Sequence, residues 1–129
     1  MRKGGVTVGI RTGVWRTAAG STLKLIVKNG KVSGQYSTVR GQPTPEREFP
    51  IIGMVHGDLI GFICSWNEHN SLTSWCGRYG VEDSRECIRT TWHLARIYAD
   101  RAHKQENEYW ETFTSYTDTY FLVSENVAP

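Results

Sequence analysis

The sequence predicts an all-β protein, an eight-stranded antiparallel up-and-down β-barrel. Apolar and polar residues alternate with a period of two along most of the 129 residues, as in strands that bury one face. Turn signals such as Asn29-Gly30 separate these runs at short spacing. No amphipathic helix of useful length is evident. Eight strands joined by short hairpins close most simply into a barrel, because closure removes the exposed sheet edges.

The clearest hairpin joins residues 22–28 to residues 32–38, after a first strand at 13–18. In 22–28, positions 23, 25 and 27 are apolar, whereas lysines occupy positions 24 and 28. Asn29-Gly30 follows, and both residues tolerate the positive φ that a two-residue hairpin turn requires. In 32–38, Val32 and Tyr36 share one face with Gly34. These strands are therefore expected to pair in register across the turn.

The remaining strands are separated by segments with turn chemistry. A loop rich in Pro, Gly and charge covers 40–48, and polar turns are expected at 56–58 and 67–70. The polar segment 97–107 is expected to hold a helical turn. The expected strands are 49–55, 59–66, 72–79, 86–94 and 112–123, with 72–79 and 86–94 forming a hairpin across 80–85.

Length and charge exclude several classes of protein. The chain has the size of one domain, so we expect a single barrel domain over 1–129 with its core at about 12–123. The formal charge of +2 is too balanced for a nucleic-acid partner. The longest uncharged apolar run, 59–66, is too short to span a membrane. No secretory signal is visible, because residues 4–11 lack a continuous apolar stretch.

The three cysteines do not indicate a metal site, because they lack the close spacing of zinc ligands. Cys64 shares a strand face with Trp66 and is expected to pack as a small buried hydrophobe. Cys76 and Cys87 are expected to face outward. In a hairpin centred near Val81 they would lie opposite each other, so a disulfide and two unpaired thiols remain alternatives.

Aromatic and hydroxyl side chains fall on the same strand faces. Five tryptophans lie on five segments. Alternation places Ser71 and Thr73 beside Trp75, and Thr90 beside Trp92. An inward hydroxyl without a partner costs about 1–3 kcal/mol. The pattern therefore predicts an aromatic-walled cavity with polar groups at fixed points. The alternative is that each Ser or Thr is an ordinary strand former bonded to neighbouring backbone.

Six segments, in order and at compatible spacing, resemble the avidin/streptavidin family of biotin-binding proteins from about residue 13 to residue 121. A lone G-x-W is weak, because lipocalins carry it near their first strand, but the six together are specific. They are Gly13-Val14-Trp15, Ser33-Gly34-Gln35-Tyr36-Ser37-Thr38, Gly61-Phe62-Ile63-Cys64-Ser65-Trp66, the run from Ser71-Leu72-Thr73-Ser74-Trp75 to Tyr79, Thr90-Thr91-Trp92-His93-Leu94, and Trp110 through Asp118-Thr119-Tyr120.

The resemblance implies a biotin site at one open end of the barrel. Trp66 and Trp92, with Trp75, would pack the bicyclic ring, and Leu94 would lie beside them. Trp110 resembles the family's tryptophan that closes a neighbouring subunit's site. A homotetramer is therefore expected.

The resemblance also implies the polar contacts. A urea has one strong acceptor and two donors, and a dry site strengthens hydrogen bonds to it. Ser21 and Tyr36 would donate to the ureido oxygen, whereas Thr38 and Asp118 would accept from the ureido N–H groups. The remaining contacts would be those of Thr73 with the ring sulfur and of Ser71 with the valerate carboxylate.

Four positions depart from the family pattern or extend it. Thr17 stands where an Asn usually supplies a third donor, and one hydrogen bond is worth about 0.5–1.5 kcal/mol. Gln42 falls where an Asn often serves the carboxylate, and Arg40 would add a charge-assisted contact. Tyr116 replaces a frequent Gly, so it would either narrow the pocket or pack between subunits.

The expected function is high-affinity biotin binding without catalysis, with biotin as bound ligand and no cofactor. No nucleophile–base pairing is evident, and Asp118 has no second carboxylate on a pocket segment. One alternative is a lipocalin-like barrel for another small apolar ligand. Another is an avidin-like interaction module with weakened biotin binding, because of Thr17 and Tyr116. The resemblance implies a secreted or periplasmic protein.

Overall fold

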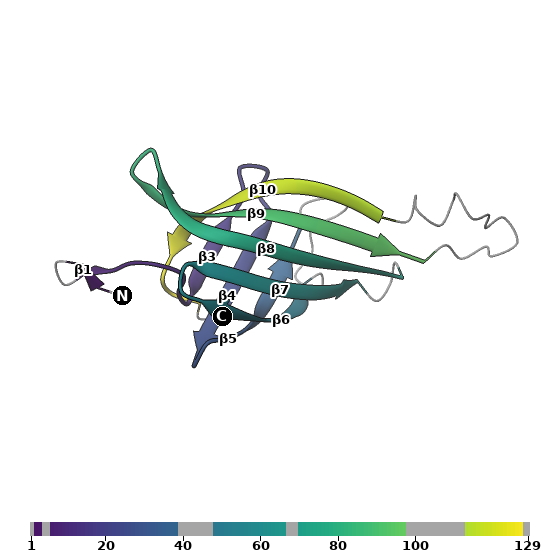
Figure 1. The fold of residues 1–129 in the computed structure, drawn as a ribbon, viewed down its shortest axis with the longest axis horizontal. Helices are drawn as coiled ribbons and strands as arrows, with labels where there is room; N and C mark the ends of the chain where they lie inside the picture. Colours follow the sequence, from purple (N-terminus) through teal and green to yellow (C-terminus); the bar gives the residue numbers. More distant parts are fainter. Residues whose placement is uncertain (1, 4–5, 39–47, 67–69, 98–112, 128–129) are drawn as a thin grey trace, which may run out of the picture.

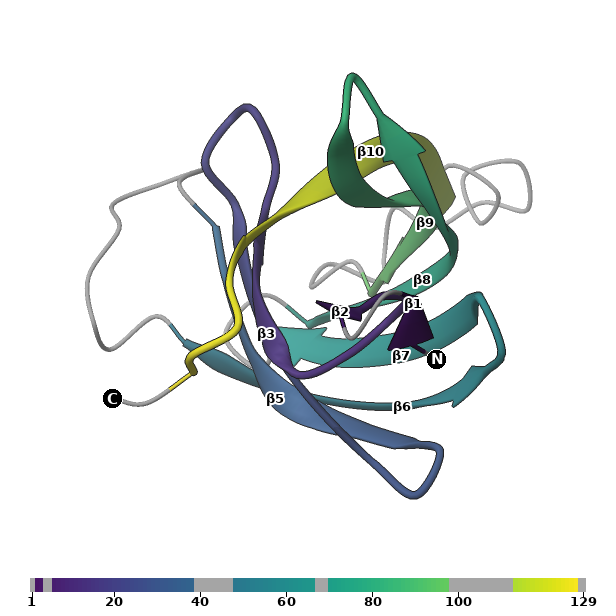
Figure 2. The same cartoon turned by 90° about the vertical axis from the view of Figure 1, so that its left-hand side faces the viewer.

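The structure is a computed structural model that describes residues 2–3, 6–38, 48–66, 70–97 and 113–127. Eight strands form a closed antiparallel barrel in the order β10-β3-β4-β5-β6-β7-β8-β9, which confirms the predicted fold class (Figures 1 and 2). The barrel strands are β3 Gly13–Arg16, β4 Thr22–Lys28, β5 Lys31–Ser37, β6 Phe49–His56, β7 Leu59–Trp66, β8 Ser71–Glu82, β9 Arg85–Arg96 and β10 Phe113–Ser124.

Two elements differ from the sequence prediction. The hairpin of β8 and β9 is longer than expected, because the chain reverses at Asp83 and Ser84 alone, with φ of 52° and 62°. Two successive residues with positive φ are typical of a type I′ turn, which needs no further connection. A short antiparallel ribbon, β1 Arg2–Lys3 and β2 Val6–Thr7, precedes the barrel and was not predicted. The helical turn expected at 97–107 lies outside the described residues, apart from Ile97.

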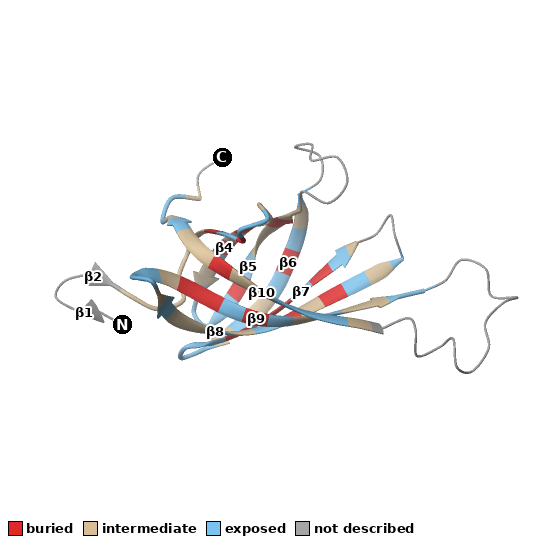
Figure 3. Cartoon of the chain, turned by 90° about the horizontal axis from the view of Figure 1, so that it is seen from above, coloured by how far each residue is buried: buried red, intermediate tan, exposed pale blue. Residues whose placement is uncertain are grey.

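The barrel interior is filled by one face of each strand. Burial alternates along the strands, as the buried bands in Figure 3 show. Trp15, Leu23 and Leu25 are fully buried, and the Phe62 ring stacks on Trp75 at 4.7 Å between centroids. Burying each such side chain contributes about 1.5–3 kcal/mol. The alternation that predicted the strands thus also predicts which side chains form the core.

Close approach of β4 and β5 requires a glycine at position 34. Gly34 has a φ of 137°, and a Cβ there would lie 1.8 Å from the carbonyl oxygen of Lys24. No L side chain fits at that distance without moving the backbone. Gly34 therefore lets the first hairpin bend into the barrel wall.

The structure resolves the alternatives for the cysteines against a disulfide. All three cysteines are free. In the β8–β9 register, Cys76 lies opposite Thr91 and Cys87 lies opposite Gly80, so the two thiols do not face each other. The two were expected to lie opposite each other because the turn was placed two residues too early. Cys87 faces away from the barrel interior but is nevertheless buried. Its neighbour on β10 is Phe121, and the Arg85 guanidinium lies over the Phe121 ring, 4.2 Å from the ring centroid.

Cys64 is buried in the core, as predicted, and we expect it to resist alkylation. Burial raises the pKa of the Cys64 thiol to about 12, and the thiolate is the reactive species. At pH 8, iodoacetamide should modify Cys64 more than about 100-fold more slowly in the folded protein than in denaturant. Peptide mass spectrometry measures this ratio. Equal rates in the two states would contradict the placement of Cys64 in the core.

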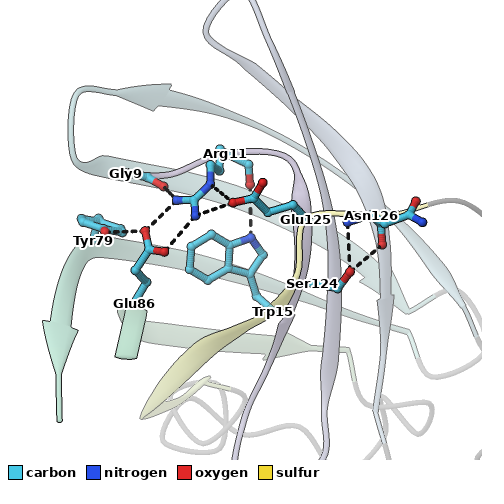
Figure 4. Close-up of polar contacts among 8 residues, drawn as sticks. All are labelled: Gly9, Arg11, Trp15, Tyr79, Glu86, Ser124, Glu125 and Asn126. Atoms are coloured by element: carbon cyan, nitrogen blue, oxygen red, sulfur yellow. Dashed lines mark hydrogen bonds and ion pairs between the residues drawn. The ribbon is translucent and has the colours of Figure 1, made fainter. Parts of the chain in front are cut away.

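An ionic cluster closes the end of the barrel where β3 and β9 begin (Figure 4). Arg11 donates two hydrogen bonds to Glu86, at 2.7 and 2.8 Å, and also reaches Glu125 at 2.8 Å. The Tyr79 hydroxyl donates to Glu86 at 2.6 Å, and the indole of Trp15 donates to the Arg11 carbonyl. The cluster therefore ties residues before the first barrel strand to β8, β9 and the end of β10.

This cluster makes stability depend on pH in the acid range. The Arg11 guanidinium holds the pKa of Glu86 below its ordinary value of 4.5. A carboxyl with a lowered folded pKa stabilises the fold above its ordinary pKa, and that contribution is lost as the pH falls through the folded value. Below about pH 4.5 the free energy of unfolding should fall with pH, and the slope should be smaller in Glu86→Gln. Urea unfolding at pH 3 to 7 measures both slopes; identical slopes would exclude Glu86 as a contributor.

Candidate ligand-binding cavity

A cavity of about 370 Å³ opens at the other end of the barrel. Its residues come from the turn after β3, the ends of β5, β7 and β9, the start of β8 and the middle of β10. Closure of the barrel brings these strand ends to one rim, although the residues are up to about 100 positions apart in sequence. The lining residues are Thr17, Ala19, Ser21, Tyr36, Thr38, Trp66, Ser71, Thr73, Trp75, Trp92, Leu94, Arg96 and Asp118.

Every predicted site residue within the described residues lies on this cavity. The other three, Arg40, Gln42 and Trp110, fall outside the described residues. Arg96 was not among the predicted site residues, because the predicted strand ended at residue 94. It lies opposite Ser71 at the rim and lines the cavity. The alternation that placed Trp92 and Leu94 inward extends to position 96, and that signal was missed.

Aromatic rings form the wall of the cavity. The Tyr36 ring lies 4.8 Å from Trp75 and 5.7 Å from Trp66 between centroids. Trp66 and Trp75 meet edge to face at 6.4 Å, and Phe49 supports Trp66 from behind at 4.7 Å. Edge-to-face and tilted contacts at these distances are favourable. The wall is therefore held in place before any ligand arrives.

Indole N–H groups orient two polar groups at the cavity. Trp66 donates to the Thr73 hydroxyl and Trp92 donates to Oδ2 of Asp118, both at 2.7 Å. The backbone carbonyl of Asp118 accepts from Thr90 at 2.9 Å, which fixes its position on β10. Within the part of the chain that the structure describes, Oδ1 of Asp118 has no partner. Asp118 therefore keeps one oriented carboxylate oxygen for a donor in the cavity.

The turn between β3 and β4 brings further hydroxyls to the rim. Oγ1 of Thr17 accepts the Ser21 backbone N–H at 3.1 Å, and the backbone closes the turn through Thr17 N–H to Ser21 carbonyl at 3.0 Å. Ser21 in turn reaches the Thr38 hydroxyl at 3.5 Å. Because Thr17 accepts the backbone bond, its hydroxyl proton remains available to the cavity.

Below the cavity a buried residue joins two of its lining side chains. Tyr120 is fully buried, and its hydroxyl lies 2.7 Å from that of Tyr36 and 3.0 Å from Nε1 of Trp75. Burial raises the pKa of Tyr36, opposed by hydrogen bonds with Tyr120 and Ser21. Both tyrosines are therefore neutral at ordinary pH. Sequence reasoning missed Tyr120, although it shares the inward face with Asp118 two residues earlier.

Tyr116 does not line the cavity. Its ring packs on Trp92 at 4.9 Å between centroids, with a tilt of 37°, and it is 54% exposed. Its register partner is Trp92 itself. Tyr116 was expected either to narrow the pocket or to pack between subunits. In this structure it does not narrow the pocket.

Two further features of the described ranges bear on what the molecule does. No three side chains among His, Cys, Asp and Glu come together there as metal ligands would. The same ranges contain no helix with the length and apolar character needed to cross a lipid bilayer.

The fold and the cavity define a small up-and-down barrel with a cavity of small-ligand size at one end. The sequence profile of the Avidin family matches residues 7–121 of this chain. The chain therefore belongs to the avidin family.

Individual relatives agree with this assignment. Afifavidin from Afifella pfennigii is 32% identical over 106 residues, which cover 78% of this chain and 65% of afifavidin. This chain thus spans just under two thirds of that relative's length. A crystal structure of a rhizavidin–biotin complex is similar with a TM-score of 0.70 and 29% identity, over 92% of this chain and 97% of that chain. A short afifavidin–biotin complex gives a TM-score of 0.67 and 30% identity, over 86% and 87%.

Proposed function

We propose that this protein binds biotin, without catalysis, in the cavity at the end of its barrel. The observation that carries the proposal is that the polar groups of the cavity match the hydrogen-bonding groups of the ureido ring of biotin. The Tyr36 hydroxyl, a potential donor, and the Asp118 carboxylate, oriented by Trp92, line the same cavity together with indole rings. The two relatives with solved biotin complexes support the choice of ligand.

The urea is recognised through its one acceptor and two donors. Tyr36 and Ser21 donate to the ureido oxygen, whereas Asp118 and Thr38 accept from the ureido N–H groups. A carboxylate acceptor makes its hydrogen bond charge-assisted, and the surrounding indoles exclude water from it. Thr17 adds a weaker third donor, because its proton is free of the backbone bond that its oxygen accepts.

The rest of the ligand is held by the wall and the rim. Trp66, Trp75 and Trp92 pack the bicyclic ring. Thr73 already accepts the Trp66 N–H, so its proton is directed elsewhere, which suits the ring sulfur as acceptor. At the rim, Ser71 and Arg96 lie opposite each other and face the valerate carboxylate. No step of this recognition requires a nucleophile or a general base.

Isothermal titration with biotin tests the proposal. We expect one site per chain, a Kd below micromolar and a rise in the unfolding temperature. Hexanoate, which carries the carboxylate and an alkyl chain but no urea, is the control and should bind far more weakly. Absence of heat and of thermal shift with micromolar biotin would favour the interaction module. Equal binding of hexanoate would favour a lipocalin-like carrier.

We further propose that the protein assembles as a homotetramer and acts in the periplasm or as a secreted protein. The support for assembly is an apolar outward surface on neighbouring strands. Ile52 and Met54 of β6 are each 68% exposed, and Ile63 of β7 is the register partner of Ile52. A second copy of the chain would cover these side chains. Light scattering should give four times the chain mass; the mass of one chain would reject the assembly.

A further inference from the structure

We propose that Tyr120 is a positioning residue that fixes the Tyr36 hydroxyl as a hydrogen-bond donor toward the ligand. The inference rests on the proposed function, because it concerns how the same cavity recognises a urea oxygen. Tyr120 does not line the cavity. It acts through Tyr36, which does.

Three buried groups form one chain of hydrogen bonds. Nε1 of Trp75 lies 3.0 Å from the Tyr120 hydroxyl, which lies 2.7 Å from the Tyr36 hydroxyl. Tyr120 is 0% exposed, Trp75 4% and Tyr36 5%. The three residues come from β8, β10 and β5, so these hydrogen bonds cross the barrel interior between strands that are not neighbours in the sheet.

The direction of the chain follows from the donor at its start. An indole N–H only donates, so the Tyr120 oxygen accepts from Trp75. Among the described residues, the Tyr36 oxygen is the one acceptor bonded to the Tyr120 hydroxyl. If Tyr36 donated to Tyr120, the Tyr120 proton would be buried without an acceptor, which is unfavourable. Tyr120 therefore donates to Tyr36.

Tyr36 is then left with its own proton for the cavity. Its oxygen accepts from Tyr120, so its own proton is left for the cavity side, where the Ser21 hydroxyl is its neighbour and where a ligand oxygen would serve as acceptor. The cavity thus presents a fixed donor at this point, and a ligand with an acceptor there is preferred over one with a donor. Without Tyr120, the Tyr36 hydroxyl would rotate and accept as readily as it donates.

A pair of ligands separates this role from a merely structural one. Biotin offers an acceptor oxygen to Tyr36, whereas the analogue with an imino group in place of that oxygen offers an N–H donor when it is protonated. We compare the two Kd values at pH 7 in the native chain and in Tyr120→Phe. The preference for biotin should fall by about 2- to 10-fold in the variant, as for loss of one oriented hydrogen bond. In a Tyr36→Phe background, Tyr120→Phe should leave the preference unchanged.

The matched control is Tyr79→Phe, which removes a hydroxyl at the opposite end of the barrel and should leave the preference unaltered. Equal weakening of both ligands by Tyr120→Phe, or no change in the ratio, would overturn the positioning role while biotin binding stands. Failure of the native chain to bind biotin would instead overturn the proposed function and this inference together. If Tyr120→Phe does not fold, Trp75→Phe is the second variant, because it removes the N–H that makes the Tyr120 hydroxyl donate to Tyr36. The same fall in the preference for biotin over the imino analogue is expected. An unchanged ratio of the two Kd values in Trp75→Phe would reject the positioning role.

Discussion

Replacing Asp118 by alanine is expected to weaken biotin binding by about 10- to 100-fold, the range for a hydrogen bond to a charged group. The variant removes the carboxylate oxygen that faces the cavity. It also leaves the Trp92 indole N–H, now bonded to Oδ2 at 2.7 Å, without its acceptor. Both losses weaken the bound state, because the ureido N–H loses its acceptor and Trp92 loses its orientation.

Asp118→Asn separates the two losses. Asparagine offers an amide oxygen to Trp92 but carries no charge, so its effect on the Kd should lie between those of the native chain and Asp118→Ala. Asp58→Ala, which removes an exposed carboxylate from the turn between β6 and β7, is the control and should bind normally. Isothermal titration measures all four proteins. A Kd for Asp118→Ala within twofold of the native value would contradict the role given to this carboxylate.

Replacing Arg11 by methionine is expected to lower the free energy of unfolding by about 1–3 kcal/mol, as for loss of hydrogen bonds to charged groups. Arg11 is 13% exposed and Glu86 25% exposed, so Glu86 would be left with neither its main partner nor full hydration. Removing one partner of a buried ion pair lowers stability by more than the intact pair contributes, because the remaining charge is left buried without a partner. The biotin Kd should not change, because the cluster lies at the end of the barrel away from the cavity.

Arg89→Met is the matched control for this variant. Arg89 pairs with Glu82 at 3.0 Å, but it is 67% exposed, and water and salt screen an exposed pair so that it contributes little to stability. Urea unfolding of both variants at pH 7 gives the comparison. An Arg11→Met protein as stable as Arg89→Met would show that the cluster does not hold the closed end of the barrel.

Strand faces could be read from the sequence with good accuracy. Period-2 alternation placed Tyr36, Trp66 and Trp92 on inward faces, and the closed barrel then brings them to one cavity. Alternation fixes the face because a side chain in a strand has only two directions. The family resemblance then indicated which of the inward residues lie together at the open end of the barrel.

Contacts that depend on exact register could not be read in the same way. Alternation puts Tyr120 inward but does not say that its hydroxyl reaches both Tyr36 and Trp75, because that needs the spacing between strands that are distant in sequence. The pairing of Arg11 with Glu86 joins positions 75 residues apart and follows only from barrel closure. The cysteine positions failed for a related reason, since a turn misplaced by two residues changes every partner along β8 and β9.

A crystal structure of the biotin complex tests the central claim most directly. We predict that the ring lies within the aromatic cavity, with the ureido oxygen at hydrogen-bonding distance from the Tyr36 hydroxyl and one ureido N–H facing Oδ1 of Asp118. Biotin bound outside the cavity, or with its ureido oxygen turned away from Tyr36, would contradict it.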